Sequence, residues 1–138
     1  MSSTAQSLLQ VMVVDDQGTM RSILRQLLAN VGIDNVLEAE NGEKALEILQ
    51  GCTQKMGGQL PDVIISDLHM DGMDGMEFCN TLRRSKKLEI PVIILTGDSD
   101  RLLHETTLQV GAVAIMTKPV SAGDLLQKIE EVVGFSVN

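Results

Sequence analysis

Aromatic side chains are nearly missing from this 138-residue chain, which contains two Phe and no Trp or Tyr. Proteins that bind single-stranded nucleic acids stack the bases on aromatic rings, and this chain has almost no side chains for that purpose. Basic residues are also scarce, because 11 Lys and Arg stand against 19 Asp and Glu and leave a net charge of −8. Such a charge repels phosphate backbones and anionic lipids. We therefore expect neither nucleic acid nor a membrane as the main partner.

Cysteine and long apolar runs are scarce too. Cys52 and Cys79 form no Cys-x-x-Cys or zinc-site spacing, and two separate thiols are typical of a reducing compartment. The longest apolar runs, such as 92–95, are far too short to cross a bilayer, and residues 1–6 lack the basic segment that opens a secretory signal. We expect a cytoplasmic protein with one domain over residues 1–138.

A unit made of a short apolar run, a polar turn and a segment with helical spacing occurs five times along the chain. The predicted strands are Gln10–Val14, Asn35–Ala39, Asp62–Ser66, Val92–Leu95 and Val113–Met116. The predicted helices are Met20–Val31, Gly42–Gln50, Gly75–Arg84, Ser99–Val110 and Ser121–Val133, with a surface loop over Gly51–Pro61. This alternation predicts an α/β fold, a doubly wound five-stranded parallel sheet of strand order 2-1-3-4-5 with helices on both faces, as in flavodoxin-like proteins.

Polar side chains follow four of the predicted strands. Asp15 and Asp16 follow the first strand, Asp67 the third, Thr96 the fourth and Lys118 the fifth. In an open parallel sheet, ligands bind beyond the carboxyl ends of the strands, where the strand order reverses. We therefore expect three carboxylates, a hydroxyl and an amine to meet at this edge of the sheet, which we call the mouth.

The chemistry of this set is specific. Three carboxylates brought close together repel one another unless a cation lies among them, and Mg²⁺ prefers oxygen ligands and keeps waters that a phosphate oxygen can replace. A carboxylate can also attack phosphorus and form an aspartyl-phosphate, provided that metal, ammonium and hydroxyl groups neutralise the charge on the phosphoryl oxygens. Asp16, Lys118 and Thr96 could supply those roles.

Several segments resemble the receiver domain of two-component response regulators. They are Val13-Val14-Asp15-Asp16, Ile64-Ile65-Ser66-Asp67, Met73-Asp74-Gly75, Ile94-Leu95-Thr96-Gly97 and Thr117-Lys118-Pro119. Within this family, Thr19-Met20-Arg21 and Glu38-Ala39-Glu40-Asn41-Gly42 are most similar to the single-domain chemotaxis regulators. The resemblance covers nearly the whole chain.

The resemblance implies a role for each residue at the mouth. Asp67 would accept a phosphoryl group from a histidine kinase, and Asp15, Asp16, Asp67 and the backbone carbonyl of His69 would hold Mg²⁺. Thr96 and Lys118 would contact the phosphoryl group. The partner surface would be formed by the fourth helix, the fifth strand and the fifth helix.

Three positions depart from the family pattern. Ile115 stands where the family has an aromatic switch residue, so we expect the switch to depend on Thr96 and its loop more than on residue 115. Asp71 replaces a common proline. His69 and Asp98 occupy positions that flank the path of hydrolytic water in the family.

Other interpretations of the same residues are weaker. Adjacent aspartates often form a turn or a helix cap, and a lone lysine is most often a surface charge. A haloacid dehalogenase-type phosphohydrolase would need Asp-x-Asp after the first strand, and an FMN binder would need a hydroxyl-rich loop there. Residues 67–78 have Phe78 where a calcium loop requires glutamate, and no nucleotide-binding Gly-rich motif occurs.

We therefore expect a stand-alone, monomeric response regulator that catalyses only its own aspartyl phosphorylation and dephosphorylation. It would signal by phosphorylation-dependent binding to a target protein, with the flagellar motor switch in chemotaxis as the first candidate. The alternative is a phosphate sink or relay that passes the phosphoryl group to a histidine phosphotransfer protein.

Overall fold

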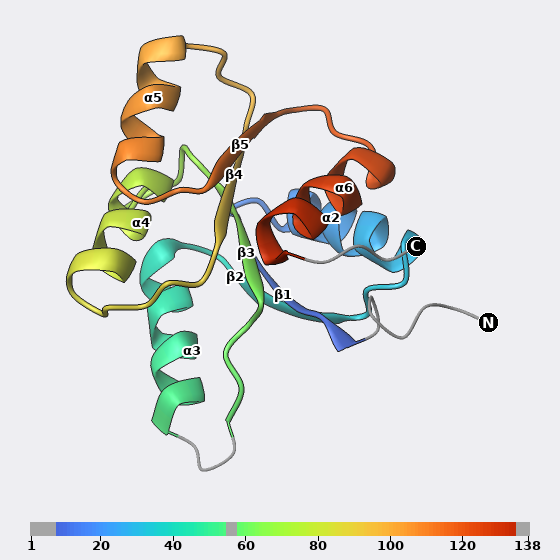
Figure 1. Ribbon diagram of the computed structural model, residues 1–138, viewed down its shortest axis with the longest axis horizontal. Helices are drawn as coiled ribbons and strands as arrows, with labels where there is room; N and C mark the ends of the chain where they lie inside the picture. The colour runs from blue at the N-terminus through green and yellow to red at the C-terminus, as the bar shows by residue number, and fades with distance from the viewer. Residues whose placement is uncertain (1–7, 55–57, 135–138) are drawn as a thin grey trace.

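A computed structural model describes residues 8–54 and 58–134 of the chain (Figure 1). Five parallel strands form one sheet in the order β2-β1-β3-β4-β5, which confirms the predicted fold. The strands are β1 (Gln10–Val14), β2 (Asn35–Ala39), β3 (Val63–Asp67), β4 (Val92–Thr96) and β5 (Ala114–Thr117). The helices are α2 (Gly18–Asn30), α3 (Gly42–Gln54), α4 (Gly75–Arg84), α5 (Arg101–Gln109) and α6 (Ala122–Val133).

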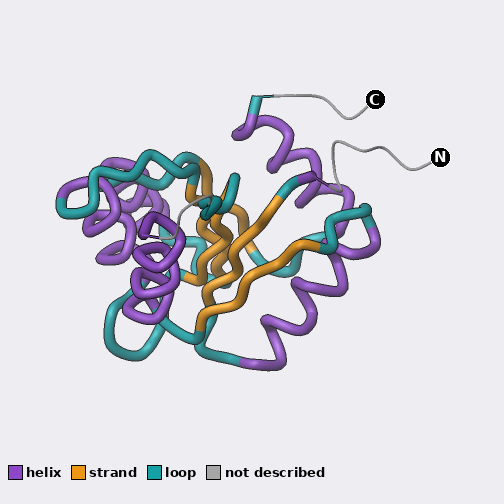
Figure 2. Tube along the Cα trace, turned by 90° about the horizontal axis from the view of Figure 1, so that it is seen from below, coloured by secondary structure: helices purple, strands orange, loops and turns teal. Residues whose placement is uncertain are grey.

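Helices cover both faces of the sheet, as the edge-on view in Figure 2 shows. Helices α2 and α6 lie on one face, and α3, α4 and α5 lie on the other. Successive strand residues point to opposite faces, so Met12 and Val14 pack under α3 and α4 while Val11 and Val13 pack under α2 and α6. The strands are buried on both sides, which explains why they appear in the sequence as continuous apolar runs.

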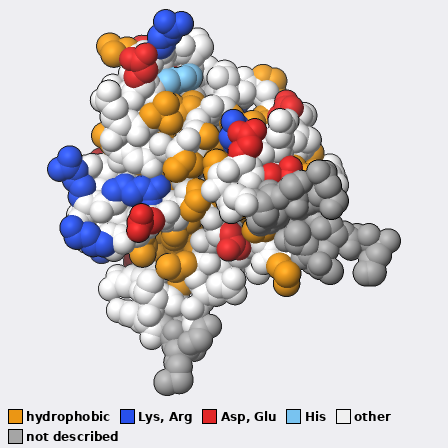
Figure 3. Space-filling view, in the orientation of Figure 1, with side chains coloured by type: hydrophobic (Ala, Val, Ile, Leu, Met, Phe, Trp, Pro, Cys, Tyr) orange, Lys and Arg blue, Asp and Glu red, His pale blue; other side chains and the backbone are white. Residues whose placement is uncertain are grey.

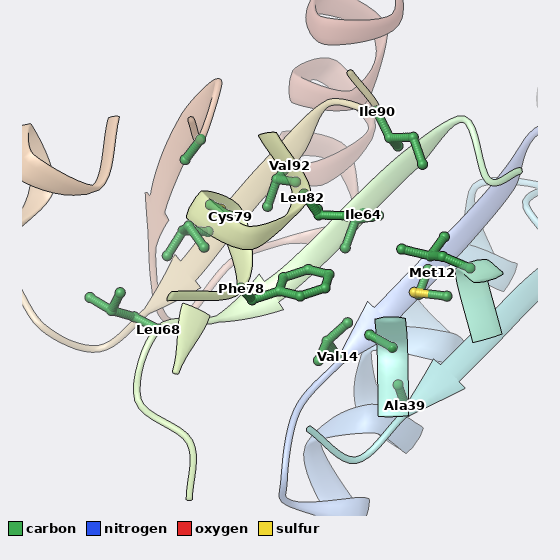
Figure 4. Close-up of a cluster of buried hydrophobic side chains, with 14 residues drawn as sticks. Met12, Val14, Ala39, Ile64, Leu68, Phe78, Cys79, Leu82, Ile90 and Val92 are labelled. Carbon is green, nitrogen blue, oxygen red and sulfur yellow. The ribbon is translucent and has the colours of Figure 1, made fainter. Parts of the chain in front are cut away.

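The larger core lies between the sheet and α3 and α4. Figure 4 places Phe78 of α4 over the strand that carries Ile64, with Leu82 one turn further along the helix. All three side chains are completely buried. Each contributes roughly 1.5–3 kcal/mol through its removal from water, and this packing fixes the position of α4 against β3.

The boundaries of α2 have local causes. Gly32 has φ +88°, and the amides of Gly32 and Ile33 donate to the carbonyls of Ala29 and Leu28. This left-handed residue closes the helix with the hydrogen bonds that glycine allows at low cost. Gly32 is thus the residue at which the chain leaves α2.

Several boundaries differ from the sequence prediction, most by one or two residues. Helix α2 begins two residues earlier than predicted, at Gly18, and α5 begins two residues later, at Arg101. Helix α3 continues to Gln54, where Thr53 donates its hydroxyl to the carbonyl of Gln50, so the first four residues of the predicted loop 51–61 are helical. Residues 55–57 of that loop and residues 1–6 lie outside the described residues. Strand β3 runs from Val63 to Asp67, one residue later than predicted at both ends, and just before it the Asp62 carboxylate accepts the amide of Gln10 at 2.8 Å. Strand β5 likewise starts one residue later than predicted, at Ala114, and ends at Thr117.

No helix in the described part of the chain is long and apolar enough to cross a bilayer.

At the end of the sheet opposite the mouth, the side chain of Arg83 joins α4 to the segment that follows α5. Its guanidinium donates to the carbonyl of Gly111 at 2.8 and 3.1 Å and to that of Leu88 at 2.8 Å. Gly111 has φ +130°, and a Cβ there would lie 2.6 Å from the Arg83 side chain. The last turn of α4 and the segment after α5 are thus held together. The adjoining residues Arg84, Lys86 and Lys87 are exposed. Figure 3 shows Lys and Arg side chains gathered at its left edge, on the side where Figure 1 places α4.

Candidate functional site

The three predicted carboxylates meet at the carboxyl end of the sheet. Asp67 ends β3, and Asp15 and Asp16 follow β1, its neighbour in the sheet. One carboxylate oxygen from each residue lies within 4.8 Å of the other two. Asp15 is buried, Asp67 is half-buried and Asp16 is exposed, so the cluster opens to solvent on the Asp16 side.

Lys118 lies against the acidic cluster. Its Nζ atom is 3.7 Å from Asp15 Oδ2 and 3.6 Å from Asp67 Oδ1. Burial raises the pKa of the Asp15 carboxyl, and the nearby Asp67 charge adds to this, while the Gln17 amide and Lys118 lower the pKa. The net direction is upward, which means that one ammonium does not fully compensate the buried negative charge.

The donor set fits Mg²⁺. Every candidate ligand is an oxygen, and the carboxylates lie close enough together to share one hard cation. The raised pKa of Asp15 shows that the protein alone leaves this charge undercompensated, and a divalent cation would supply the missing positive charge. The exposed side of the cluster leaves room for water or a phosphate oxygen.

The start of α4 holds Asp67 in place. The Asp67 Oδ1 atom accepts the amide of Leu68 at 2.8 Å, and the Leu68 carbonyl accepts the amide of Gly75 at 2.8 Å. A Cβ at position 75 would overlap the Asp67 carbonyl oxygen and lie 3.0 Å from Leu68 Cα. Only glycine lets the first residue of α4 approach the end of β3 this closely.

Thr96 lies at the same end of the sheet, and its backbone is bound to Lys118. Its carbonyl accepts the amide of Lys118 at 2.8 Å, and its side chain is buried. The Thr96 hydroxyl accepts the amide of Asp98 at 3.1 Å, so in this structure it stabilises its own loop. The structure therefore places Thr96 beside the cluster with its hydroxyl engaged elsewhere.

His69 and Asp98 meet across the rim of the mouth. His69 Nε2 is 3.1 Å from Asp98 Oδ2, and His104 contacts the Asp98 carbonyl through its own Nε2. The amide of Asp100 and the His69 ring lower the pKa of the Asp98 carboxyl. The His69 side chain thus points to the rim, and the role of its backbone carbonyl as a ligand stays a prediction.

Ile115 lies away from the mouth, half-buried in β5 opposite Ile94. It packs against the core beneath α4 and α5. Its part in switching stays a prediction.

Arg21 makes a contact with the backbone of the acidic cluster that was not predicted from the sequence. Arg21 Nη1 donates to the carbonyl of Asp15 at 2.6 Å. Arg21 belongs to a segment that resembles the family motif, but nothing in its spacing from Asp15 identified the atom it would bind.

Comparison with known proteins gives one consistent family. Residues 11–130 match the family model described as the response regulator receiver domain. A chemotaxis protein CheY homolog from Campylobacter jejuni is 34% identical over 127 residues, which are 91% of this chain and 93% of that protein.

Solved structures agree. The chemotaxis protein CheY4 of Vibrio cholerae has a TM-score of 0.77 at 29% identity, over 90% of this chain and 98% of that chain. A response regulator receiver domain protein from Clostridium thermocellum has a TM-score of 0.78 at 28% identity, over 91% and 94% of the two chains. With its parallel sheet, its cluster of three aspartates and these matches, the chain belongs to the response regulator receiver domain family.

Proposed function

We propose that this receiver domain, spanning residues 1–138, accepts a phosphoryl group on Asp67 from a histidine kinase in a Mg²⁺-dependent reaction. The observation that carries the proposal is the meeting of three carboxylates and the Lys118 ammonium at one open mouth. Core packing does not require such a set. Repulsion among the carboxylates destabilises the folded state, so the presence of these residues needs a functional explanation.

Asp67 is the nucleophile in this proposal. Its half-buried carboxylate is oriented by the Leu68 amide. A carboxylate oxygen attacks the phosphorus of the donor's phosphohistidine, an O–P bond forms and the P–N bond breaks. The departing imidazole nitrogen keeps the electron pair and takes up a proton from solvent. Hydrolysis of the acyl phosphate later returns free Asp67 and phosphate.

The neighbouring groups assist by neutralising charge. Asp15 and Asp16, together with Asp67 and the carbonyl of His69, would hold Mg²⁺, which when bound would neutralise the charge of the carboxylates and the phosphoryl oxygens. Lys118 lies within 4 Å of two of these carboxylates and can follow the phosphoryl group once Asp67 is modified. The Thr96 hydroxyl would leave the Asp98 amide and turn toward the phosphoryl group.

The test is phosphorylation by acetyl phosphate, followed by intact mass spectrometry. Wild type should gain one phosphoryl group in the presence of Mg²⁺ and none in the presence of a chelator, and Asp67→Asn should gain none. Asp71→Asn is the matched control, because it removes an exposed carboxylate from the same rim. Equal labelling of wild type and Asp67→Asn would overturn the assignment.

We also propose that the output is binding of a target protein to the face formed by α5, β5 and α6. Three apolar side chains on α5 and just before β5 support this, since Leu102, Leu108 and Val113 are 69%, 44% and 49% exposed. Exposed apolar groups of this kind are typical of a protein interface. The domain is proposed to act as a cytoplasmic monomer that catalyses only its own phosphorylation and dephosphorylation.

The first candidate target is the flagellar motor switch, because the relatives named above include chemotaxis proteins. Beryllofluoride bound to Asp67 mimics the phosphoryl group, and calorimetry should show that it tightens binding to the motor switch protein of the same organism. Without such tightening, the alternative of a phosphate sink or relay stands. In that case labelled protein should pass its phosphoryl group to a histidine phosphotransfer protein.

A further inference from the structure

The peptide between Asp15 and Asp16 is held by a side chain of α2. Arg21 donates from Nη1 to the Asp15 carbonyl at 2.6 Å, and its side chain is only 21% exposed. This carbonyl belongs to the peptide that joins the two aspartates. A change in ψ of Asp15 or in φ of Asp16 alone would turn this peptide and move the Asp16 carboxylate relative to that of Asp15.

Arg21 is in turn held by the neighbouring edge strand β2. Its Nε donates to Glu38 Oε1 at 3.1 Å. Arg25 occupies the other carboxylate oxygen of Glu38 at 2.8 Å and donates to the Val36 carbonyl at 3.1 Å. Glu38 therefore joins two arginines, of which Arg21 alone contacts the backbone of the acidic cluster.

Helix stability does not explain an arginine at position 21. It is the fourth residue of α2, and the first turn of this helix contains no acidic residue. A cation near a helix N-terminus opposes the helix dipole and costs a few tenths of a kcal/mol or more. The guanidinium is placed there against this preference, and it makes two partly buried hydrogen bonds.

Asp16 has little other support. Its side chain is exposed, and its Oδ2 atom accepts one long hydrogen bond, 3.3 Å, from the amide of Asp71 in another loop. Asp15, in contrast, is buried, and its Oδ1 atom accepts the Gln17 amide at 2.9 Å. The direction of the Asp16 carboxylate thus depends on the backbone that Arg21 fixes.

We propose that Arg21, oriented by Glu38, is a positioning residue that holds the Asp15–Asp16 peptide in the conformation that binds Mg²⁺. This inference rests on the metal site of the proposed function. Groups that orient metal ligands typically change affinity by roughly 10–100-fold when removed. We expect a loss at the lower end of this range for Arg21→Met, because the preceding Val14–Asp15 peptide is still held by the hydrogen bond from Asp15 N to Ala39 O.

Four variants separate positioning from general stabilisation. Arg21→Met removes both hydrogen bonds and keeps much of the aliphatic stem. Arg21→Lys keeps a cation and one donor, and should restore part of the affinity. Glu38→Gln keeps Arg21 but replaces the charged acceptor of its Nε hydrogen bond with a neutral one. Arg25→Met is the matched control, since it removes an equal charge from the same carboxylate without touching the cluster's backbone.

Two measurements are made on the full chain. Calorimetric titration with Mg²⁺ should give a dissociation constant about tenfold higher for Arg21→Met, about threefold higher for Glu38→Gln and within about twofold of wild type for Arg25→Met. In the metal-free protein, amide hydrogen exchange at Asp16 and Gln17 should be faster in Arg21→Met and unchanged in Arg25→Met. Exchange in β3 serves as the reference for global stability.

The possible failures are distinguishable. If wild type binds no Mg²⁺ at millimolar concentration, the metal site of the proposed function is wrong. If wild type binds Mg²⁺ and Arg21→Met binds it equally well with unchanged exchange at Asp16, the positioning role is wrong. Equal losses in Arg21→Met and Arg25→Met would also overturn it, since the effect would then follow the charge on Glu38. Should Arg21→Met fail to fold, Glu38→Gln and Arg21→Lys decide.

Discussion

The two sides of the mouth are built differently. The acidic side consists of the ends of β1 and β3 and the first residues of α2 and α4, where Arg21 and Gly75 hold the backbone beside Asp15 and Asp67. The hydroxyl side consists of Thr96 at the end of β4 and the loop 97–100 before α5. Asp98 in this loop is held by Thr96 and by two histidine side chains.

The difference concerns how much each side can move. On the acidic side, an added Cβ at Gly75 would meet backbone atoms, whereas at Gly97 it would meet nothing within 4 Å. On the hydroxyl side, the hydrogen bonds of the loop involve exposed or rotatable groups, and His69 is 63% exposed. Phosphoryl transfer needs fixed ligands, and a conformational signal needs a segment that can rearrange. The two sides suit these two requirements.

The largest effect is expected from a pair of glycine substitutions. Gly75→Ala should destabilise the protein by about 1–3 kcal/mol, because the methyl group overlaps the Asp67 carbonyl and forces α4 away from β3. Gly97→Ala should stay within about 0.5 kcal/mol of wild type. Urea unfolding followed by circular dichroism measures both, since the chain has no Trp. Similar losses in the two variants would remove the contrast between the sides.

A second pair of substitutions tests the movable side. Beryllofluoride should change amide exchange in α5 and β5, and Thr96→Ala should reduce this response about tenfold, equivalent to about 1.4 kcal/mol of coupling. Ile115→Val should retain more than half of the response, because a β-branched side chain changes little in exposed area when it moves. Thr106→Ala, which loses a hydroxyl bonded to Leu102 within α5, is the control. A tenfold loss in Ile115→Val alone would show that residue 115 is the main switch element.

The pH dependence of stability tests how strongly Glu38 and its two arginines hold the acidic side. Hydrogen bonds and charge from Arg25 and Arg21 hold the pKa of Glu38 below its ordinary value of 4.5. A lowered folded-state pKa means that the stabilisation is present above pH 4.5 and is lost as the pH falls through the folded-state value. Wild type should therefore exceed Glu38→Gln by up to about 1 kcal/mol at neutral pH, and the difference should shrink below pH 4.5.

Glu47→Gln provides the comparison for this measurement, because Glu47 pairs with Lys44 at 3.5 Å on an exposed helix face. Its difference from wild type should be near zero throughout. A Glu38→Gln curve as flat as that of Glu47→Gln would contradict a fixed acidic side.

The smallest effect is expected at the rim. His69→Gln should leave the melting midpoint within experimental error at pH 7, because the contact with Asp98 is exposed and exposed ion pairs contribute little to stability. The difference between the two midpoints should also stay unchanged between about 0.05 and about 0.3 M salt. A clear drop in the melting midpoint of His69→Gln would mean that the contact between His69 and Asp98 stabilises the hydroxyl side more than its exposure indicates.

Much of the fold follows from local sequence patterns. The apolar spacing from Met20 to Val31 predicts α2 to within two residues, and Gly32 closes it in the left-handed conformation, because helix period and left-handed C-termini are local properties. The end of α3 was not predictable in the same way. Gly51 favours a helix end, yet the helix continues to Gln54, where Cys52 remains half-buried.

The site was predictable only in part. Strand ends bring Asp15, Asp67 and Lys118 together because parallel strands share one carboxyl edge, and this needs no knowledge of side-chain conformations. The Arg21 contact depends on a long side chain crossing from α2 to a backbone carbonyl, with a partner in β2. A contact of this kind leaves no periodic pattern in the sequence from which it could be predicted. The hydrogen bond of Thr96 to its own loop is likewise a matter of rotamer, which the sequence does not determine.

The fastening of Arg83 to Gly111 has a mechanical consequence for α5. Gly111 directly follows the C-cap of α5, so one end of this helix is attached to α4, while its other end begins in the loop 97–100. A helix that is attached at one end and free at the other moves most at its free end. A displacement that started near Thr96 would be largest at Leu102 and would decrease toward Leu108, so it would move the most exposed apolar side chain of the helix furthest.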